Sequence, residues 1–234
     1  MLFSIITVSY NSKETIEQTI LSVLNQTYKN IEYIIIDGGS TDGTIEIIKK
    51  YESKISYWVS EPDKGIYDAM NKGASKANGR YIAFLNSDDW YEENTIEIVA
   101  NNLKNKNFDI VCGIVNYYKN NLLIYSHGSS MNRIKEEMIM HPTSFMKLNL
   151  FKILNGFDIN YRYVADYDLM LRLNIHGCKS LYLDKVLANF RIGGASSNIK
   201  SIKEKNELKR KYCNRNIIKY IIIKYLINIY GSKL

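Results

Sequence analysis

Short apolar runs alternate with segments of helical spacing through the first half of the chain. The apolar runs predict strands at residues 3–8, 31–37, 55–60 and 80–85. Apolar residues that recur three or four positions apart predict helices around 16–24, 45–51 and 66–77. In the turn GGSTDGT, Ser40 or Thr41 is the expected N-cap of the second helix. Strands that alternate with helices at short intervals predict an α/β fold with a mostly parallel, doubly wound sheet.

The second half of the chain has a different pattern. FDIVCGIVNYY, a turn at 119–121 and LLIYSH predict an antiparallel hairpin. Further short strands are expected near 142–147, 179–183 and 186–191, and a helix is expected to begin near Asp166. We therefore expect a single α/β domain whose second half is of mixed character.

Polar residues follow three of the predicted strands directly. Asn11 and Asp37 come just past two strand ends, and the adjacent acids Asp88 and Asp89 follow a third. Ligands of such sheets bind at the carboxyl ends of the strands, so these segments are expected to converge on one crevice. Two neighbouring carboxylates repel each other and lose hydration beside apolar surface, so a divalent cation or many donors must compensate them.

Length and composition restrict the class of protein. A chain of 234 residues with 46% hydrophobic content can bury one good core. Cys112, Cys178 and Cys213 form no CxxC pair, which argues against a disulfide framework or a zinc site and fits a reducing cytoplasm. The N-terminus lacks the features of a signal peptide, and no apolar run is long enough to span a bilayer.

The positive charge is concentrated at the C-terminal end. The chain carries a net charge of +7, and residues from Asn198 onward contribute roughly +8, so the remainder is close to neutral. If residues 216–230 are helical, a narrow polar stripe faces a broad apolar surface, and basic amphipathic helices of this kind lie on anionic membranes. The alternative is a helix packed on the core or on a second copy in a homodimer. Nucleic acid is not expected as a partner, because no recognised binding module accompanies the basic run.

Seven motifs in order give the chain a family resemblance. They are SIITVSYN, SVLNQTY, YIIIDGGSTDGT, SEPDKGIYDAMNKG, GRYIAFLNSDDW, NGFD and VADYDLMLRL. Together they resemble the inverting family 2 glycosyltransferases of GT-A fold, over about residues 3–197, most closely bacterial enzymes that build O-antigen and other surface polysaccharides. The resemblance implies a Rossmann-like, mostly parallel central sheet, with a donor side at about 1–107, a smaller mixed acceptor side at about 108–197, and a basic tail at 198–234.

The resemblance also implies roles for individual residues at the donor end. Thr7 and Tyr10 flank the base of a sugar nucleotide, and Asp37 accepts a hydrogen bond from a uracil-like imide, which favours a UDP-sugar. Asp88 reaches the ribose or the metal, and Asp89 holds Mg²⁺ or Mn²⁺, hard cations that prefer oxygen ligands and bridge phosphates. Further substrate-binding candidates in the matching motifs are Asn11, Asp68 and Lys72. Outside these motifs, His141 in MHPTSF is a candidate for the acceptor side, and Arg191 in FRIGGAS is a candidate phosphate clamp.

At the acceptor end, the resemblance places the general base at Asp166. Many relatives have Glu-Asp at this point, where this chain has Ala165-Asp166. Asp168 is the rival, but it lies four residues before Arg172, a spacing that favours a surface ion pair. The implied acceptor is a saccharide on a polyprenyl diphosphate, which would bring the enzyme to the inner face of the bacterial plasma membrane as a peripheral protein.

Simpler explanations exist for each candidate. Asp88 with Asp89, and separately Asp166, could be helix caps, and Asp37 could belong to an ordinary turn. His141 could be a hydrogen-bonded structural histidine, and Arg191 could pair with a surface acid instead of clamping phosphate. For the whole chain, the alternatives are a nucleotidyltransferase, although VSYNSKET is not a glycine-rich phosphate loop, and a non-catalytic sugar- or nucleotide-binding protein.

Overall fold

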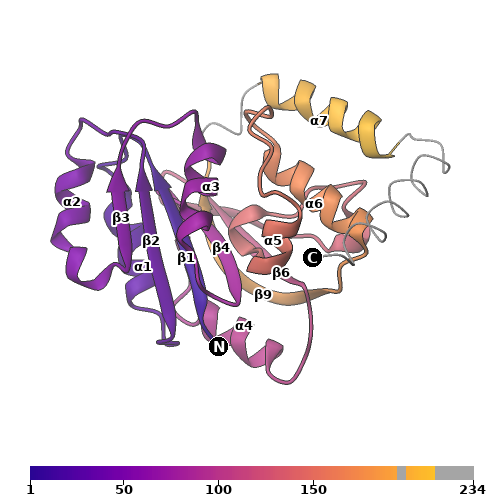
Figure 1. Cartoon of the computed structure of the whole chain (residues 1–234), viewed down its shortest axis with the longest axis horizontal. Coiled ribbons are helices and arrows are strands. Elements are labelled where there is room, and N and C mark those ends of the chain that lie inside the picture. Colours follow the sequence, from indigo (N-terminus) through magenta and orange to yellow (C-terminus); the bar gives the residue numbers. More distant parts are fainter. Residues whose placement is uncertain (194–198, 214–234) are drawn as a thin grey trace.

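A computed structural model of the chain describes residues 1–193 and 199–213 (Figure 1). The strands are β1 (Phe3–Ser9), β2 (Ile31–Asp37), β3 (Tyr57–Ser60), β4 (Tyr81–Asn86), β5 (Trp90–Tyr91), β6 (Ile110–Lys119), β7 (Leu122–Gly128), β8 (Phe145–Lys147) and β9 (Ser180–Arg191). The α-helices are α1 (Ile16–Leu24), α2 (Thr44–Lys50), α3 (Ile66–Lys76), α4 (Thr95–Leu103), α5 (Leu148–Ile153), α6 (Ala165–His176) and α7 (Ile199–Cys213). Short 3₁₀ turns are η1 (Glu52–Lys54), η2 (Met131–Arg133) and η3 (His141–Thr143).

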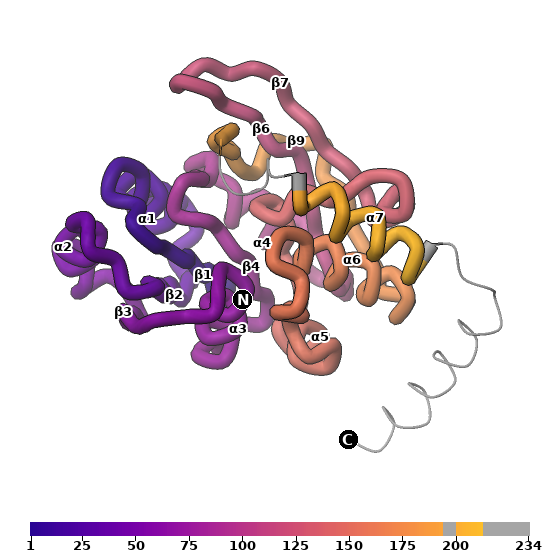
Figure 2. The backbone as a smooth tube through the Cα atoms, turned by 90° about the horizontal axis from the view of Figure 1, so that it is seen from above, coloured from indigo at the N-terminus to yellow at the C-terminus, as the bar shows by residue number. Residues whose placement is uncertain are grey.

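All of these strands belong to one sheet. Its order is β3-β2-β1-β4-β8-β6-β9-β5, and β7 pairs with β6 as the second strand of the predicted hairpin. Strands β1 to β4 are mutually parallel, as their sequence pattern predicts. The three-residue strand β8 runs antiparallel to both β4 and β6 and so joins the two halves of the sheet. The hairpin of β6 and β7 projects away from the rest of the body (Figure 2).

The central strands are mostly apolar because helices cover both faces of the sheet. Successive residues of β1, β2 and β4 alternate between two hydrophobic clusters, so Ile6 and Phe84 lie on one face while Ile5 and Leu85 lie on the other. The first cluster contains residues of α3, α5, α6 and α7, and the second contains residues of α1, α2 and α4. Both clusters include residues from each half of the chain, so the two halves share a core on each face of the sheet.

Two local predictions and one of the alternative explanations were wrong. The N-cap of α2 is Gly43, with φ of 105°, because the Ser40 hydroxyl donates to Asp37 instead. The two strands expected at 179–183 and 186–191 are a single strand, β9, whose register with β6 shifts twice around Ile114. The acids before Trp90 do not cap a helix, because β5 intervenes and α4 has Asn94 as its N-cap.

The basic segment after residue 198 begins with a helix that packs on the body. Helix α7 lies against α6, with Leu208 fully buried in the first hydrophobic cluster. The Tyr212 hydroxyl donates to Asp168 of α6 at 2.8 Å. The predicted amphipathic segment 216–230 lies outside the described residues. Among the helices within 1–193 and 199–213, none has the length and apolarity needed to cross a bilayer.

The docking of α7 predicts a contrast between two apolar residues of the same helix. Leu208→Ala should lower the free energy of unfolding by about 2–5 kcal/mol, because it leaves a cavity in a shared core. Ile202→Ala is the matched control, since Ile202 is 58% exposed and its truncation should change stability by about 0.5 kcal/mol or less. Chemical denaturation of both full-length variants measures the difference. Equal, small effects would show that α7 adds nothing to the stability of the body.

Candidate active site

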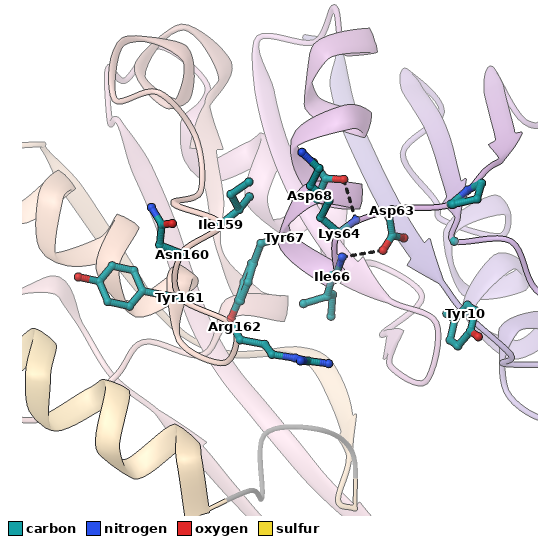
Figure 3. Close-up of a pocket in the computed structure, with 13 residues that line it drawn as sticks. Tyr10, Asp63, Lys64, Ile66, Tyr67, Asp68, Ile159, Asn160, Tyr161 and Arg162 are labelled. Atoms are coloured by element: carbon teal, nitrogen blue, oxygen red, sulfur yellow. Dashed lines mark hydrogen bonds between the residues drawn. The ribbon is translucent and has the colours of Figure 1, made fainter.

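A cleft of about 810 Å³ opens between the two halves of the chain (Figure 3). One wall carries Tyr10, just past β1, Gly38, just past β2, and the loop 62–65 that leads into α3. The other wall is the segment 159–162, which precedes α6. The cleft therefore lies at the carboxyl ends of the parallel strands, where ligands of such sheets bind.

Asp37 is a buried hub beneath this cleft. Its Oδ1 accepts from the hydroxyls of Ser9 and Ser40, and its Oδ2 accepts from the Ser60 hydroxyl. The backbone N–H groups of Gly39 and Ser40 also donate to Oδ2. Burial alone would raise the pKa of Asp37, but these hydrogen bonds outweigh it and hold the pKa below its usual value. With five donors and no exposed surface, Asp37 offers no free acceptor to a ligand, contrary to its predicted role.

The other residues at the end of β1 have separate positions. Thr7 is fully buried and its hydroxyl contacts that of Tyr33 at 3.0 Å, so its side chain does not flank the cleft as predicted. Tyr10 is 65% exposed and lines the cleft, where its ring is free to stack. The side chain of Asn11 accepts from the Thr41 N–H at 2.9 Å and so ties its loop to the turn after β2.

The adjacent acids at the end of β4 differ in exposure. Asp89 is fully buried, and its Oδ1 accepts from the Arg191 N–H at 3.2 Å. Asp88 is partly exposed. Burial raises the pKa of both carboxyls, and the charge of Asp88 raises that of Asp89 further. Within the described ranges, Asp89 Oδ2 and Asn86 Oδ1 are buried without a hydrogen-bond partner.

Arg191 lies beside these acids. Its guanidinium donates to the backbone oxygen of Asp88 at 3.3 Å and to Gln18 Oε1 at 2.7 Å, and it covers the ring of Trp90. The side chain is therefore held by neutral oxygens and an aromatic face, and among the described residues it forms no ion pair within 4 Å, although its charge lowers the pKa of both Asp88 and Asp89.

Asp166 lies at the start of α6, beside the cleft. Its Oδ1 accepts from the Tyr67 hydroxyl and from the Tyr167 N–H, both at 2.9 Å. Burial raises the pKa of Asp166 to about 6, although these hydrogen bonds oppose the shift. Tyr67 itself lines the cleft, so it connects the carboxylate to the open space. Asp166 is not the N-cap of α6, a position that Val164 holds.

Asp68 and Lys72 organise the loop that forms one wall of the cleft. Asp68 Oδ2 accepts from the Lys64 N–H at 3.0 Å, in the turn that starts α3. Lys72 pairs with Glu61 at 2.9 Å and donates to the Pro62 oxygen at 2.9 Å. Asp68 lines the cleft directly, whereas Lys72 supports it from behind.

Two further candidates are buried away from the cleft lining. His141 stacks on Phe84 with 5.5 Å between ring centroids, and burial lowers the pKa of its imidazole to about 4. Its Nε2 has no partner among the described residues. Asp168 pairs with Arg172 at 2.7 Å, as the spacing predicts, but the pair is buried and not at the surface, because α7 covers it.

The sequence prediction did not single out three residues that line the cleft. Asp63, Tyr67 and Arg162 all face it (Figure 3). The sequence EPDKG could have indicated Asp63, because it favours the local turn in which Asp63 Oδ1 accepts from the Gly65 N–H at 2.7 Å. No local sequence pattern indicates Arg162, because its position depends on the long-range contact between Glu204 of α7 and the N–H groups of residues 162 and 163.

Comparisons with known proteins agree on one family. Residues 4–166 match the profile described as Glycosyl transferase family 2. An uncharacterized glycosyltransferase of Rickettsia typhi is 30% identical over 247 residues, covering 99% of this chain and 76% of the relative. A PGL/p-HBAD biosynthesis glycosyltransferase of Mycobacterium bovis is 30% identical over 216 residues, covering 89% and 83%.

Solved structures share the fold at lower identity. The S. aureus TarS fragment 1-349 in complex with UDP-GlcNAc has a TM-score of 0.75 at 20% identity, over 91% of this chain. A mannosyltransferase of Pyrobaculum calidifontis in complex with GDP-Man and Mn²⁺ has a TM-score of 0.67 at 15% identity, over 87% of this chain. The chain spans 65% and 60% of these two structures. The match over residues 4–166 and the shared architecture show that the chain belongs to glycosyltransferase family 2 and adopts the GT-A fold.

Proposed function

We propose that the protein is a metal-dependent inverting glycosyltransferase that moves a sugar from a nucleoside diphosphate donor to a hydroxyl of a saccharide acceptor. The observation that carries this proposal is the cleft between the two halves, which Tyr10 lines, with Asp166 beside it and hydrogen-bonded to the lining residue Tyr67. A UDP-sugar is the favoured donor, and the TarS fragment of similar fold in complex with UDP-GlcNAc supports that choice.

Asp166 is proposed as the general base. A carboxylate whose pKa is about 6 is mostly ionised at neutral pH, yet it is basic enough to accept a proton from a sugar hydroxyl as that oxygen attacks. The oxygen forms a bond to the anomeric carbon while the bond to the diphosphate oxygen breaks, so configuration inverts and the nucleoside diphosphate leaves with the electron pair. Tyr67 holds the carboxylate by its 2.9 Å hydrogen bond.

The residues at the end of β4 fit a divalent cation. Burial raises the pKa of both carboxyls, and the adjacent Asn86 Oδ1 is buried without a hydrogen-bond partner, so the protein itself compensates these acids only in part. In the part of the chain that the structure describes, no three His, Cys, Asp or Glu side chains gather. Mg²⁺ or Mn²⁺ would therefore have to be held by one or two carboxylates together with substrate phosphates. When bound, the ion would neutralise charge that develops on the departing diphosphate.

Exposure decides which acid would hold the ion. We assign the direct contact to Asp88, which is partly exposed, whereas Asp89 is fully buried and accepts from the Arg191 N–H. This reverses the roles expected from the sequence. Asp89 and Arg191 instead position the Asp88 backbone, to which the Arg191 guanidinium donates.

We further propose that the acceptor is carried on a polyprenyl diphosphate at the cytoplasmic membrane face. The support is the charge of residues 198–234, roughly +8. Anionic lipid attracts such a segment by about 1 kcal/mol per basic residue near the surface. In this proposal residues 1–107 form the donor side and 108–197 the acceptor side, with α7 packed on the latter.

The first test of the function is Asp166→Asn. With a panel of nucleotide sugars and Mn²⁺, the native protein should release a nucleoside diphosphate from a UDP-sugar, and the variant should do so about 100 to 10,000 times more slowly. Its affinity for UDP should stay near normal, since only the base is lost. Asp184→Asn, a change at an exposed strand position, is the control and should keep full activity. Loss of UDP binding, or surviving turnover, would contradict the assignment of Asp166.

The same assay has a predicted pH dependence. The base acts in its deprotonated form, so kcat/KM should rise with pH up to about 6 and then level off. Below that value, kcat/KM should fall about tenfold per pH unit.

A second test separates the two acids. Asp88→Asn should abolish the enhancement of UDP affinity by Mn²⁺, because the exposed carboxylate is removed. Asp89→Asn should retain the enhancement, since an amide oxygen still accepts from the Arg191 N–H. Titration of UDP with and without Mn²⁺, alongside binding of Mn²⁺ followed by electron paramagnetic resonance, measures both effects. If Asp89→Asn lost the enhancement and Asp88→Asn kept it, the direct metal contact would be assigned to Asp89.

Membrane attachment is tested with vesicles and the full chain. The protein should sediment with phosphatidylglycerol vesicles but not with phosphatidylcholine vesicles, and high salt should weaken binding because it screens the basic residues. Failure to bind anionic vesicles at low salt would remove the membrane proposal and leave the transferase activity untouched.

A further inference from the structure

Recognition of a nucleotide base by a carboxylate needs an oxygen with a free lone pair at the surface of the cleft. Asp37, the residue expected to provide it, is fully buried and already accepts five hydrogen bonds. A carboxylate has room for about four such bonds, so Asp37 is saturated.

Asp63 meets the requirement that Asp37 fails. It lines the cleft on the same wall as Tyr10, and it is only partly buried (Figure 3). Its Oδ1 accepts from the Gly65 N–H at 2.7 Å, which fixes the orientation of the carboxylate. Within residues 1–193 and 199–213, no protein donor is bonded to Oδ2.

Gly38 is what allows this carboxylate to lie beside Tyr10. A β-carbon placed on Gly38 would lie 2.6 Å from Asp63 Oδ2 and 3.4 Å from Tyr10 Cδ2. The first distance is shorter than a van der Waals contact, so any other residue at position 38 would displace the Asp63 carboxylate. The Asp63 oxygen and the exposed ring of Tyr10 therefore both adjoin the position that a β-carbon of residue 38 would occupy, which only glycine leaves open.

We propose that Asp63, in the space left by Gly38, is the residue that recognises the base of the donor nucleotide. This deepens the proposed function and depends on it. Tyr10 would stack on the base while Asp63 Oδ2 accepts its imide N–H. Uracil presents that donor at N3 and guanine at N1, whereas cytosine and adenine present an acceptor nitrogen at the corresponding edge. A carboxylate in this position favours the first pair and repels the second.

The test is the binding of four free nucleotides, UDP, GDP, CDP and ADP, each with Mn²⁺, to the full chain. The native protein should bind UDP or GDP at least about tenfold more tightly than CDP and ADP, which is the size of effect expected of one hydrogen bond to a charged group. Asp63→Asn should weaken binding of the preferred nucleotide by about tenfold. It should also bring CDP toward parity, because the amide can donate to cytosine N3. The amide oxygen can still accept from the Gly65 N–H, so the loop should keep its conformation.

Gly38→Ala provides a second, independent variant. It should produce the same loss of preference without altering the carboxylate itself, through the 2.6 Å contact. Asp184→Asn is the matched control and should leave all four affinities unchanged, and thermal unfolding should confirm that every variant is folded.

The outcomes separate the two levels of the proposal. A native protein that binds none of the four nucleotides contradicts the proposed function. A native preference for UDP or GDP that persists in both Asp63→Asn and Gly38→Ala overturns the role of Asp63 and leaves the function standing. A native preference for CDP or ADP also overturns it, because a carboxylate at that edge would repel either base.

Discussion

The wall of the cleft that carries Tyr10 and the loop 62–65 depends on one buried carboxylate. Among the residues that the structure describes, Asp37 has no ion-pair partner, so its charge must be satisfied by hydrogen-bond donors, and these come from β1, the turn after β2, and β3. Each of these strands ends in a loop that lines or supports the cleft. By holding Ser9 and Ser60 in place, the carboxylate fixes where Tyr10 and the loop at 62–65 begin.

The sequence predicts the central sheet well because its strands are buried on both faces. Continuous apolar runs at 3–8, 31–37 and 80–85 correspond closely to β1, β2 and β4. The role of Asp37 could not be predicted in the same way. Two of its hydroxyl donors lie 28 and 23 residues away in the chain, so the saturation of the carboxylate is a tertiary property. The prediction that Thr7 flanks the base fails for a similar reason, because residue type does not indicate which face of β1 contacts Tyr33.

Helix α6 also shows that local sequence cannot decide which of two acids lies beside the cleft. Asp166 and Asp168 are two positions apart, so they project about 200° apart around the helix. One therefore contacts Tyr67 beside the cleft, and the other contacts Arg172 and Tyr212 on the far side. The spacing of Asp168 and Arg172 predicts their pairing, but the burial of that pair comes from α7, more than thirty residues away along the chain, which no local pattern reveals.

The short strand β8 affects how the chain folds during its synthesis. It supplies three residues, Phe145 to Lys147, that pair with β4 on one side and β6 on the other. During synthesis, β1 to β4 are complete once residue 86 has been added, but the free edge of β4 has no partner until residue 147 emerges. A nascent chain therefore carries an open, apolar strand edge for about sixty residues of elongation, the kind of edge on which unfinished chains associate. Chaperone binding is expected to concentrate on this interval of translation.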